Sequence, residues 1–424
     1  MAVSKVVFGN NTIMDITDST ITADKVLEGE IAYAADGSRI VGTASGGGGG
    51  EAPSGGMLIS ISDDNLTIQQ RMNTVHRQIN MPITISDQTK NASYIFYMCN
   101  LLNCPVIIGN NVEHLDYAFF QCSNYNHPIN LPSSLKTMNN AFQTFSKFNY
   151  PITIPNSVEN MFGAFWACTN FNQPMTIPGN VIDARYALNA CYNFNQELTI
   201  ENGPKMLSGI LQFCNKFNRP VNIPASANTI TYAFANCDTM NSRINLPYNV
   251  SGKIDMSFTF SSMRFLNSPQ ILTEPSLLRG TFFRSINFNS PVLIRGNYDN
   301  FNFKNNSYFT YDMFNFSHNF RSNLIFDISV NNAEMGNRSF YSCIRLNSAR
   351  NYQAPVRIYA PDPMIDIVRA SDSLFFGTAI TWTATTNGYF NSGYNFYLLN
   401  NISDAKNSFN EYWNTVYGEY PDYE

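Results

Sequence analysis

The sequence predicts a β-rich α+β solenoid, a right-handed stack of about 12 coils of 23 residues each. Three observations predict it. An asparagine recurs every 23 residues, a short segment of alternating apolar residues follows it, and a second apolar segment containing Ala-Phe completes the unit. One such unit cannot bury its own apolar face, so neighbouring units must stack and share a continuous core.

The recurring asparagine sets the length of the unit, and a proline stands two residues after most copies of it. The spacing shifts slightly at Asn267 and Asn289 and is met again at Asn347. At about 4.8 Å per coil, about 12 coils give a stack about 60 Å long. The copies with constant spacing are Asn80, Asn103, Asn126, Asn149, Asn172, Asn195, Asn218 and Asn241.

Each asparagine precedes a segment such as "PITIP" at residues 151–155, which predicts a short strand. Ile152 and Ile154 are expected to point inward, with Thr153 between them pointing outward. The second half of the unit, with its Ala-Phe pair, has helical or 3₁₀ spacing but is too short for a long helix.

The chain contains eight cysteines, and seven of them lie four residues before one of the asparagines. Phe145 occupies this position in the coil that lacks a cysteine there, which indicates a buried apolar position. A ladder of disulfides would need suitable Cα separations in every pair, so we expect reduced core thiols. The seven are Cys99, Cys122, Cys168, Cys191, Cys214, Cys237 and Cys343; Cys104 is out of phase.

Composition excludes several classes of function. The net charge is -5 without a basic stripe, which argues against nucleic-acid binding. No apolar run approaches the roughly 20 residues of a membrane helix. The start of the chain lacks the pattern of a secretory signal, so we expect synthesis in the cytoplasm. Cys-x-x-Cys pairs are missing and the four histidines are scattered, so neither a metal nor another cofactor is expected.

A polysaccharide hydrolase is the enzymatic alternative, because glycoside hydrolysis normally uses two carboxylates across a groove. Glu159 and Asp183 are 24 residues apart and could lie on adjacent coils. Solvated turn residues are the preferred interpretation of both, and the pair Asp63-Asp64 also indicates a turn. Because no other catalytic motif appears, we predict no enzyme and no catalytic residues.

The repeat "V-x-x-M-x-x-AF-x-x-C-x-x-FN-x-P-ITIP" resembles the BspA-like leucine-rich repeat of bacterial surface antigens, and even more the related Mycoplasma-type lipoprotein repeat. The resemblance covers about residues 75–350. It departs in two ways: one residue is missing before "AF", and Phe171, Phe194 and Phe217 replace a leucine. It implies a leucine-rich-repeat-like fold that serves adhesion and carries no catalytic residues in the repeat.

The first 43 residues resemble the N-terminal module of tail, fibre and other minor structural proteins from phages of Gram-positive bacteria. The matching features are Thr22-Ala23-Asp24, Gly29 and the Asp36-Gly37 turn. We expect two short strands, a capped helical turn at Thr22 and a hairpin through Asp36-Gly37. The resemblance implies virion attachment through this module, with apolar residues Val6, Val7, Phe8, Ile13, Ile16, Val26, Leu27 and Ile40.

Four regions follow. Residues 1–43 form the attachment module, the Gly/Ser-rich residues 44–56 a flexible linker, residues 57–360 the solenoid and residues 361–424 a capping region. In the last region a helical face is expected, with Ser403 or Asp404 as its N-cap, and a cap over the open end of the solenoid is preferred. The aromatic tail could instead form a partner or oligomer contact. The helical face consists of Ala405, Phe409, Trp413 and Val416.

The outward strand face is the candidate binding surface. It carries a Thr/Asn row, whose alternative role is a solubilising ladder, and a variable residue after each asparagine. The candidate receptor-facing residues are His127, Tyr150, Gln173, Gln196, Arg219, Thr153 and Thr176.

The resulting prediction is a non-enzymatic phage virion protein, in a tail fibre or baseplate appendage, that recognises the host surface. A purely structural decoration of the tail, baseplate or head is the alternative. The expected partners are other virion proteins and a host cell-surface glycan or protein, and a homotrimer is compatible with the resemblance.

Overall fold

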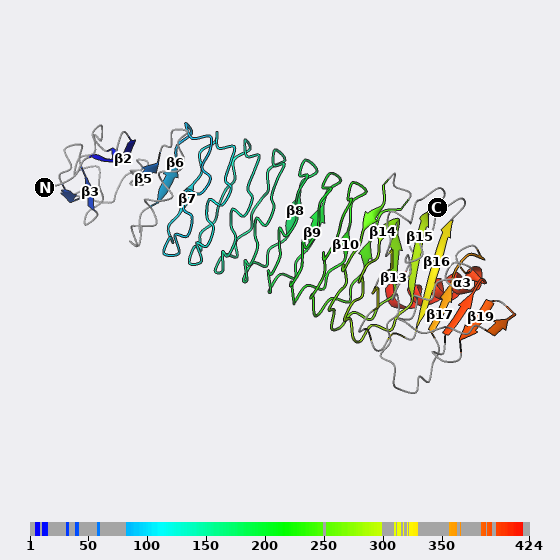
Figure 1. Cartoon of the computed structure of the whole chain (residues 1–424). Coiled ribbons are helices and arrows are strands. Elements are labelled where there is room, and N and C mark those ends of the chain that lie inside the picture. The colour runs from blue at the N-terminus through cyan, green and yellow to red at the C-terminus, as the bar shows by residue number, and fades with distance from the viewer. Residues whose placement is uncertain are drawn as a thin grey trace.

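The computed structural model describes residues 82–248 and 252–298 continuously. It also describes the backbone of five strands between residues 5 and 59 and several segments between residues 309 and 418. The coils follow one another along a single direction and end in a wider sheet with helix α3 (Ile402–Tyr417) beside it (Figure 1).

The central part of the chain is a stack of parallel coils. Isolated parallel bridges join residues 23 apart, from Asn91 with His114 to Met206 with Thr229. On the opposite side of the coils, short strands also pair in parallel with this register. The predicted 23-residue spacing is therefore present here. These strands are β6 (Ile83–Ile85), β7 (Val106–Ile107), β8 (Met175–Ile177), β9 (Leu198–Ile200), β10 (Val221–Asn222) and β11 (Ile244–Asn245).

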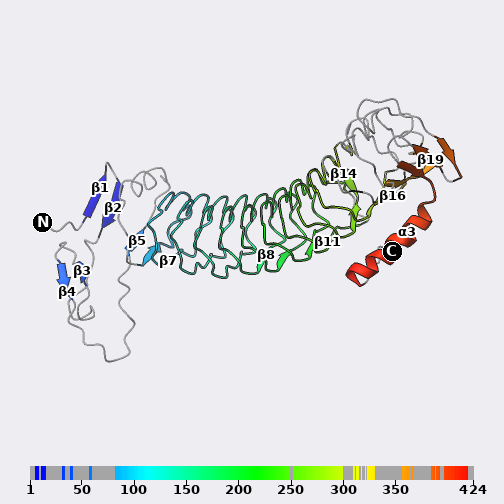
Figure 2. The ribbon, with the colours of Figure 1, turned by 90° about the horizontal axis from the view of Figure 1, so that it is seen from below.

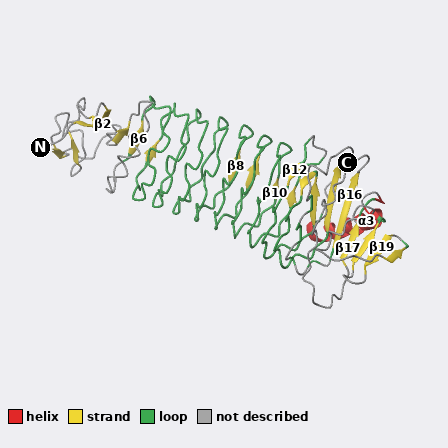
Figure 3. Cartoon of the chain, viewed as in Figure 1, coloured by secondary structure: helices red, strands yellow, loops and turns green. Residues whose placement is uncertain are grey.

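The alternating segments place their side chains as predicted, even where no regular strand forms. Residues 151–155 lack strand assignment, yet Ile152 and Ile154 are buried and Thr153 is exposed. Met175 and Ile177 of β8 are likewise buried around the exposed Thr176. The two-residue periodicity thus leaves one row of outward side chains on the side of the coils that carries the short strands, which we call the strand face. Figure 3 shows these strands in yellow.

The second half of each coil is a pair of turns, which corrects the expected helical or 3₁₀ conformation. The amide of Ala141 donates to the Met138 carbonyl at 3.1 Å, and that of Phe145 donates to Phe142 at 3.1 Å. The third residues of these turns, Asn140 and Thr144, have φ values of 50° and 64°. A type II turn requires positive φ at this position, so the i,i+3 spacing arises from turns.

Buried aromatic rings form columns through the stack. The rings of Phe148 and Phe171 lie 6.1 Å apart, and those of Phe194 and Phe217 lie 5.7 Å apart. Burying each such ring contributes about 1.5–3 kcal/mol. The phenylalanines that replace the leucine of the related repeats therefore form a continuous column of stacked rings in this core.

The described cysteines are free, which confirms the prediction of reduced thiols for them. The Sγ of Cys168 donates to the Phe142 carbonyl of the preceding coil at 3.1 Å. Cys122, Cys191, Cys214 and Cys237 repeat this contact with their own preceding coils. Cys343 lies outside the described residues.

Beyond residue 245 the coils change length, as the shifted spacing at Asn267 and Asn289 indicated. The later separation of 32 residues differs from the predicted 23-residue unit. Gln270 pairs with Val292, and Val292 with Leu324, in strands separated by 22 and 32 residues. A seven-stranded sheet has the order β13-β15-β16-β17-β20-β19-β18. Its first five strands are parallel, and β19 and β18 are added antiparallel.

The strands of this sheet are β13 (Gln270–Thr273), β15 (Val292–Asn297), β16 (Asn323–Ser329), β17 (Val356–Tyr359), β18 (Thr383–Thr385), β19 (Gly388–Asn391) and β20 (Phe396–Leu399). Beside it, β12 (Ile254–Asp255) pairs with β14 (Pro275–Leu277). The sheet contains strands on both sides of residue 360, and the domain boundaries themselves remain predictions.

Helix α3 (Ile402–Tyr417) covers the outer face of the sheet rather than the end of the stack, which corrects the predicted cap (Figure 2). Its buried residues Ala405, Phe409 and Trp413 form one cluster with four residues that point outward from the strands. Val416 was predicted to share this buried side but is 41% exposed. The four strand residues are Ile271, Leu293, Ile325 and Tyr359.

The start of α3 also differs from the prediction. The N-cap is Asn401, without a side-chain capping bond, and not Ser403 or Asp404. Asp404 lies in the first turn, where its carboxylate accepts a hydrogen bond from Nδ2 of the Asn401 side chain at 3.2 Å. A negative charge at this end of a helix is favourable for the helix dipole.

Near the N-terminus, two antiparallel pairs are described. The first joins β1 (Lys5–Phe8) to β2 (Asn11–Asp15), and the second joins β3 (Ile31–Tyr33) to β4 (Arg39–Val41). The second pair flanks the predicted hairpin turn at Asp36-Gly37. The predicted cap at Thr22 lies outside the described residues. Strand β5 (Met57–Ile59) pairs in parallel with β6 and so joins the stack.

Candidate functional site

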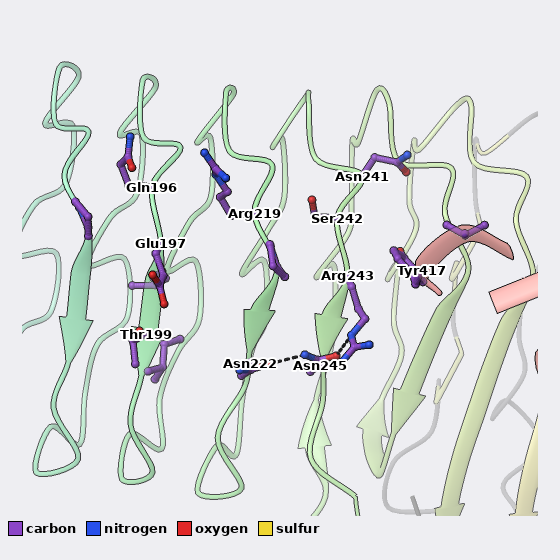
Figure 4. Close-up of a pocket in the computed structure, with 15 residues that line it drawn as sticks. Gln196, Glu197, Thr199, Arg219, Asn222, Asn241, Ser242, Arg243, Asn245 and Tyr417 are labelled. Atoms are coloured by element: carbon purple, nitrogen blue, oxygen red, sulfur yellow. Dashed lines mark hydrogen bonds between the residues drawn. The ribbon is translucent and has the colours of Figure 1, made fainter. Parts of the chain in front are cut away.

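A groove of about 1000 Å³ lies on the strand face of the coils that carry β8 to β11 (Figure 4). Its lining begins at Pro174 and continues over the next coils to Asn245. At one end it is bounded by the last turn of α3, through Val416 and Tyr417. The position of α3 on the sheet therefore turns one part of an otherwise open face into a bounded site.

The floor of the groove consists of outward side chains from three adjacent strands: Thr199, Asn222 and Asn245. The Asn245 amide donates to Oδ1 of Asn222, and Nε of Arg243 donates to Oδ1 of Asn245. This chain of hydrogen bonds holds the floor and the Arg243 side chain in one arrangement before any ligand arrives.

The residues that follow the recurring asparagines form one rim of the groove. Nε of Arg219 donates to the Asn195 carbonyl of the preceding coil at 3.1 Å. Ser242 makes the equivalent bond to Asn218 at 3.0 Å. Outside the groove, the side-chain amide of Gln173 donates to the Asn149 carbonyl. Nε2 of His127 lies within hydrogen-bond distance of the Asn103 carbonyl. These four residues of the variable row therefore also join their coils to the preceding ones.

The charges of the groove come from Arg219, Arg243 and Glu197. Arg219 and Glu197 are exposed, and Arg243 is half-buried. Within the described part of the chain, no carboxylate lies within ion-pair distance of either guanidinium. The site is thus more positive than the chain as a whole, whose net charge is -5.

The α3 end of the groove combines an apolar and a phenolic side chain. Burial raises the pKa of Tyr417, and the side chains of Ser268 and Gln270 offset part of this effect. Tyr417 therefore remains a neutral phenol at neutral pH. The helix ends at Gly418, whose amide donates to the Asn414 carbonyl at 2.9 Å with φ of 91°, in the left-handed region that glycine tolerates.

The seven candidate residues of the strand face are divided by the structure. Gln196 and Arg219 line the groove. The other five lie outside the groove lining. Thr153 and Thr176 are exposed, whereas His127, Tyr150 and Gln173 are half-buried. Tyr150 packs against the core, 6.0 Å from the ring of Phe148.

Sequence reasoning missed Arg243, and it considered Tyr417 only within the aromatic tail, as the alternative of a partner or oligomer contact. Arg243 stands two residues after Asn241, where most coils have proline, and this substitution was a readable signal. Tyr417 lacked such a signal, because its contribution depends on where α3 packs. Among the expected attachment residues, Val6, Val7 and Phe8 lie in β1, Ile13 in β2 and Ile40 in β4. Ile16, Val26 and Leu27 lie outside the described residues.

The carboxylates considered for hydrolysis do not form a free pair. Asp183 is buried, which corrects its interpretation as a solvated turn residue, and Arg185 binds it at 2.7 Å. Glu159 is exposed. Among the described residues we find no group of three or more potential metal ligands. None of the described helices is long and apolar enough to cross a membrane.

Comparison with known proteins relates the repeats to one family. Residues 90–202 and 178–274 match the family described as "Mycoplasma protein of unknown function, DUF285". This match supports the BspA-like repeat that the sequence indicated over this part of the chain. A solved leucine-rich cell surface protein from Faecalibacterium prausnitzii A2-165 is 15% identical with a TM-score of 0.37, over 89% of this chain and 100% of that chain. No curated protein matches the chain.

Proposed function

We propose that this protein is a non-enzymatic recognition protein whose leucine-rich-repeat-like solenoid binds a ligand on a cell surface through the strand-face groove. The groove carries this proposal. Two guanidinium groups, four amides, two hydroxyls and a tyrosine line it on a preformed backbone, and such side chains recognise polar ligands. The BspA-like repeat over residues 90–274 agrees with an adhesion scaffold.

The setting we propose is an external appendage of a phage virion. The N-terminal resemblance supports it, because such modules attach minor structural proteins to the particle. Residues 44–56 form a Gly/Ser-rich tether between this module and the coils, so that one end holds and the other reaches outward. The partners in this proposal are other virion proteins, a host cell-surface glycan or protein and, in a fibre, two further copies of the chain.

A purely structural decoration is the second candidate, and one observation favours it. Arg219, Ser242, Gln173 and His127 each bond the preceding coil, so the variable row has a scaffold role that needs no receptor. Particles whose copy of the chain lacks residues 57–424 separate the two functions. Normal adsorption of these particles to host cells supports decoration, and loss of adsorption supports recognition.

The groove chemistry supports a binding role over hydrolysis. Glu197 is the single acidic residue among the described residues that line the groove, whereas glycoside hydrolysis normally uses two. Incubation of the full chain with host cell-wall polysaccharide tests this point. We expect binding without release of reducing sugar, and catalytic product release would overturn the assignment.

The proposed function is tested by mass spectrometry of purified particles and by competition for adsorption. We expect the protein among the particle components and expect the purified full chain to slow adsorption of particles to host cells. Absence from the particle would refute the virion setting. A full chain that neither binds the cells nor competes would refute surface recognition.

A further inference from the structure

We infer that the strand-face groove takes an anionic glycan, whose acidic groups are bound by Arg219 and by Arg243. This inference rests on the proposed recognition function and names the ligand class of the same site. The shared chemistry of the ligand is an oxyanion, a carboxylate or a phosphate, carried on a chain of hydroxyl-bearing units.

Each of the two guanidinium groups is held by a hydrogen bond from Nε and keeps further donors for a ligand. Each uses Nε for a hydrogen bond, Arg219 to the Asn195 carbonyl and Arg243 to Oδ1 of Asn245. Their Nη atoms make no hydrogen bond to the described residues. Arginine side chains with Nη donors left over bind carboxylate or phosphate oxygens, often with two parallel bonds.

The floor of the groove provides partners for hydroxyl groups. Thr199, Asn222 and Asn245 lie in successive strands, about 4.8 Å apart. Amide and hydroxyl side chains both donate and accept hydrogen bonds, as sugar hydroxyls do. At the α3 end, Tyr417 and the partly exposed Val416 offer apolar surface for the C–H groups of a sugar ring.

The position of the groove favours a glycan over an acidic peptide. Extended peptides commonly bind by adding a strand to a free sheet edge. Here the backbone is already used between coils, since β10 pairs with β11 and the amides of Val221 and Ile223 donate to the next coil. A ligand on this face meets side chains only, so recognition depends on amides, hydroxyls and guanidinium groups.

The experiment is isothermal titration calorimetry of the full chain with three probes. These are oligogalacturonate, poly(glycerol phosphate) and neutral maltohexaose, and the first two distinguish a sugar carboxylate from a phosphodiester. We expect one anionic probe to bind with an affinity that falls as salt rises, and the neutral probe to bind at least about tenfold more weakly. Equal binding of the neutral probe, or no binding of either anionic probe, would overturn the inference.

The matched variants are the double change Arg219→Gln with Arg243→Gln, and Lys216→Gln as the control. Lys216 is exposed in the same part of the stack but does not line the groove. We expect a loss of roughly tenfold or more in affinity for the double variant and an unchanged affinity for the control. Equal losses of affinity in the double variant and in Lys216→Gln would show that net charge, and not the groove, determines binding. Circular dichroism of both variants verifies that the fold is retained.

Two further arms separate this inference from the proposed function. Host cells that bind the double variant as well as the unchanged protein would refute the anionic ligand and leave surface recognition intact. Tighter binding of poly-glutamate than of both anionic polymers would assign the groove to an acidic peptide. Binding that appears only after removal of residues 419–424, which include Glu419, Asp422 and Glu424, would identify the chain's own acidic end as the occupant.

Discussion

The backbone amide of Asn172 donates a hydrogen bond to Oδ1 of Asn149, one coil earlier, with an N···O distance of 2.8 Å. Oδ1 of Asn172 in turn accepts from the amide of Asn195 at 2.8 Å. The same contact recurs along the stack as far as Asn289. These side chains lie at the surface, exposed or half-buried, because the bond they make is at the corner of the coil. The repeated asparagine therefore builds the scaffold.

Asn172→Ala should lower the free energy of unfolding by about 1 kcal/mol, since the Asn195 amide loses its acceptor. Urea denaturation followed by circular dichroism measures the loss. The control is Asn180→Ala, which removes an exposed donor to the Asn156 carbonyl and should cost less than half as much. Equal costs would show that the asparagine ladder has no special role.

Gly209→Ala should destabilise the stack by about 1–3 kcal/mol. Gly209 has φ of 63°, and an added Cβ would lie 2.4 Å from the ring of Tyr186 in the preceding coil. The ring and the turn would both have to shift. Gly252→Ala is the matched control, because no heavy atom lies within 4 Å of its added Cβ. Thermal unfolding midpoints of the two variants measure the difference. An equal fall of the midpoint in Gly252→Ala and Gly209→Ala would contradict this explanation.

Alkylation by iodoacetamide should distinguish Cys99 from the buried cysteines in the folded protein. Burial raises the pKa of Cys99 to about 11, and raises that of Cys168 well above its usual value. Cys99 is half-buried and Cys168 fully buried. Since the thiolate is the reactive form, labelling of Cys99 should rise about tenfold per pH unit between pH 8 and pH 10. Cys168 should stay unlabelled until the protein is unfolded with guanidinium chloride. Labelling of Cys168 in the folded protein at the rate of Cys99 would contradict its burial.

The length of the coil, the strand positions and the buried cysteines could all be predicted, because each depends on a residue's place in the repeat. The pair of turns could not. Tyr117 and Thr144 have positive φ at the third turn position although neither is glycine, and the apolar i,i+3 spacing of turns resembles that of a helix. Stacking against neighbouring coils overrides the local preference of these residues, as in the Tyr94–Tyr117 ring stack at 5.0 Å.

Trp413→Ala should cost about 3–5 kcal/mol in the stability of the α3–sheet contact, because its buried ring belongs to the same apolar cluster as Ile271, Leu293 and Ile325. Hydrogen exchange of the α3 amides should accelerate in this variant. Tyr412→Ala on the same helix should have little effect, since Tyr412 is 41% exposed. Unchanged exchange in Trp413→Ala would contradict the packing of α3 on the sheet.

The position of α3 had a signal in the sequence that the repeat obscured. The fourth residue after each asparagine is Thr or Asn in most coils, but it is Ile271 after Asn267 and Leu293 after Asn289. Two successive apolar residues in an outward row require a cover, and α3 provides it. The end of the groove follows from this packing. Its Gln196–Arg219 rim and the outward Thr/Asn row of its floor could be predicted from the repeat, but its boundary at α3 could not.

The most direct test of the strand-face groove as the recognition site compares two threonines of one outward row. Thr199 lines the groove and Thr153 lies outside it, and both are exposed. Thr199→Trp fills the groove, whereas Thr153→Trp adds the same ring elsewhere on the face. Binding of the labelled full chain to host cells should fall at least about tenfold in Thr199→Trp and stay unchanged in Thr153→Trp. Equal binding by the two variants would contradict the assignment of recognition to the groove.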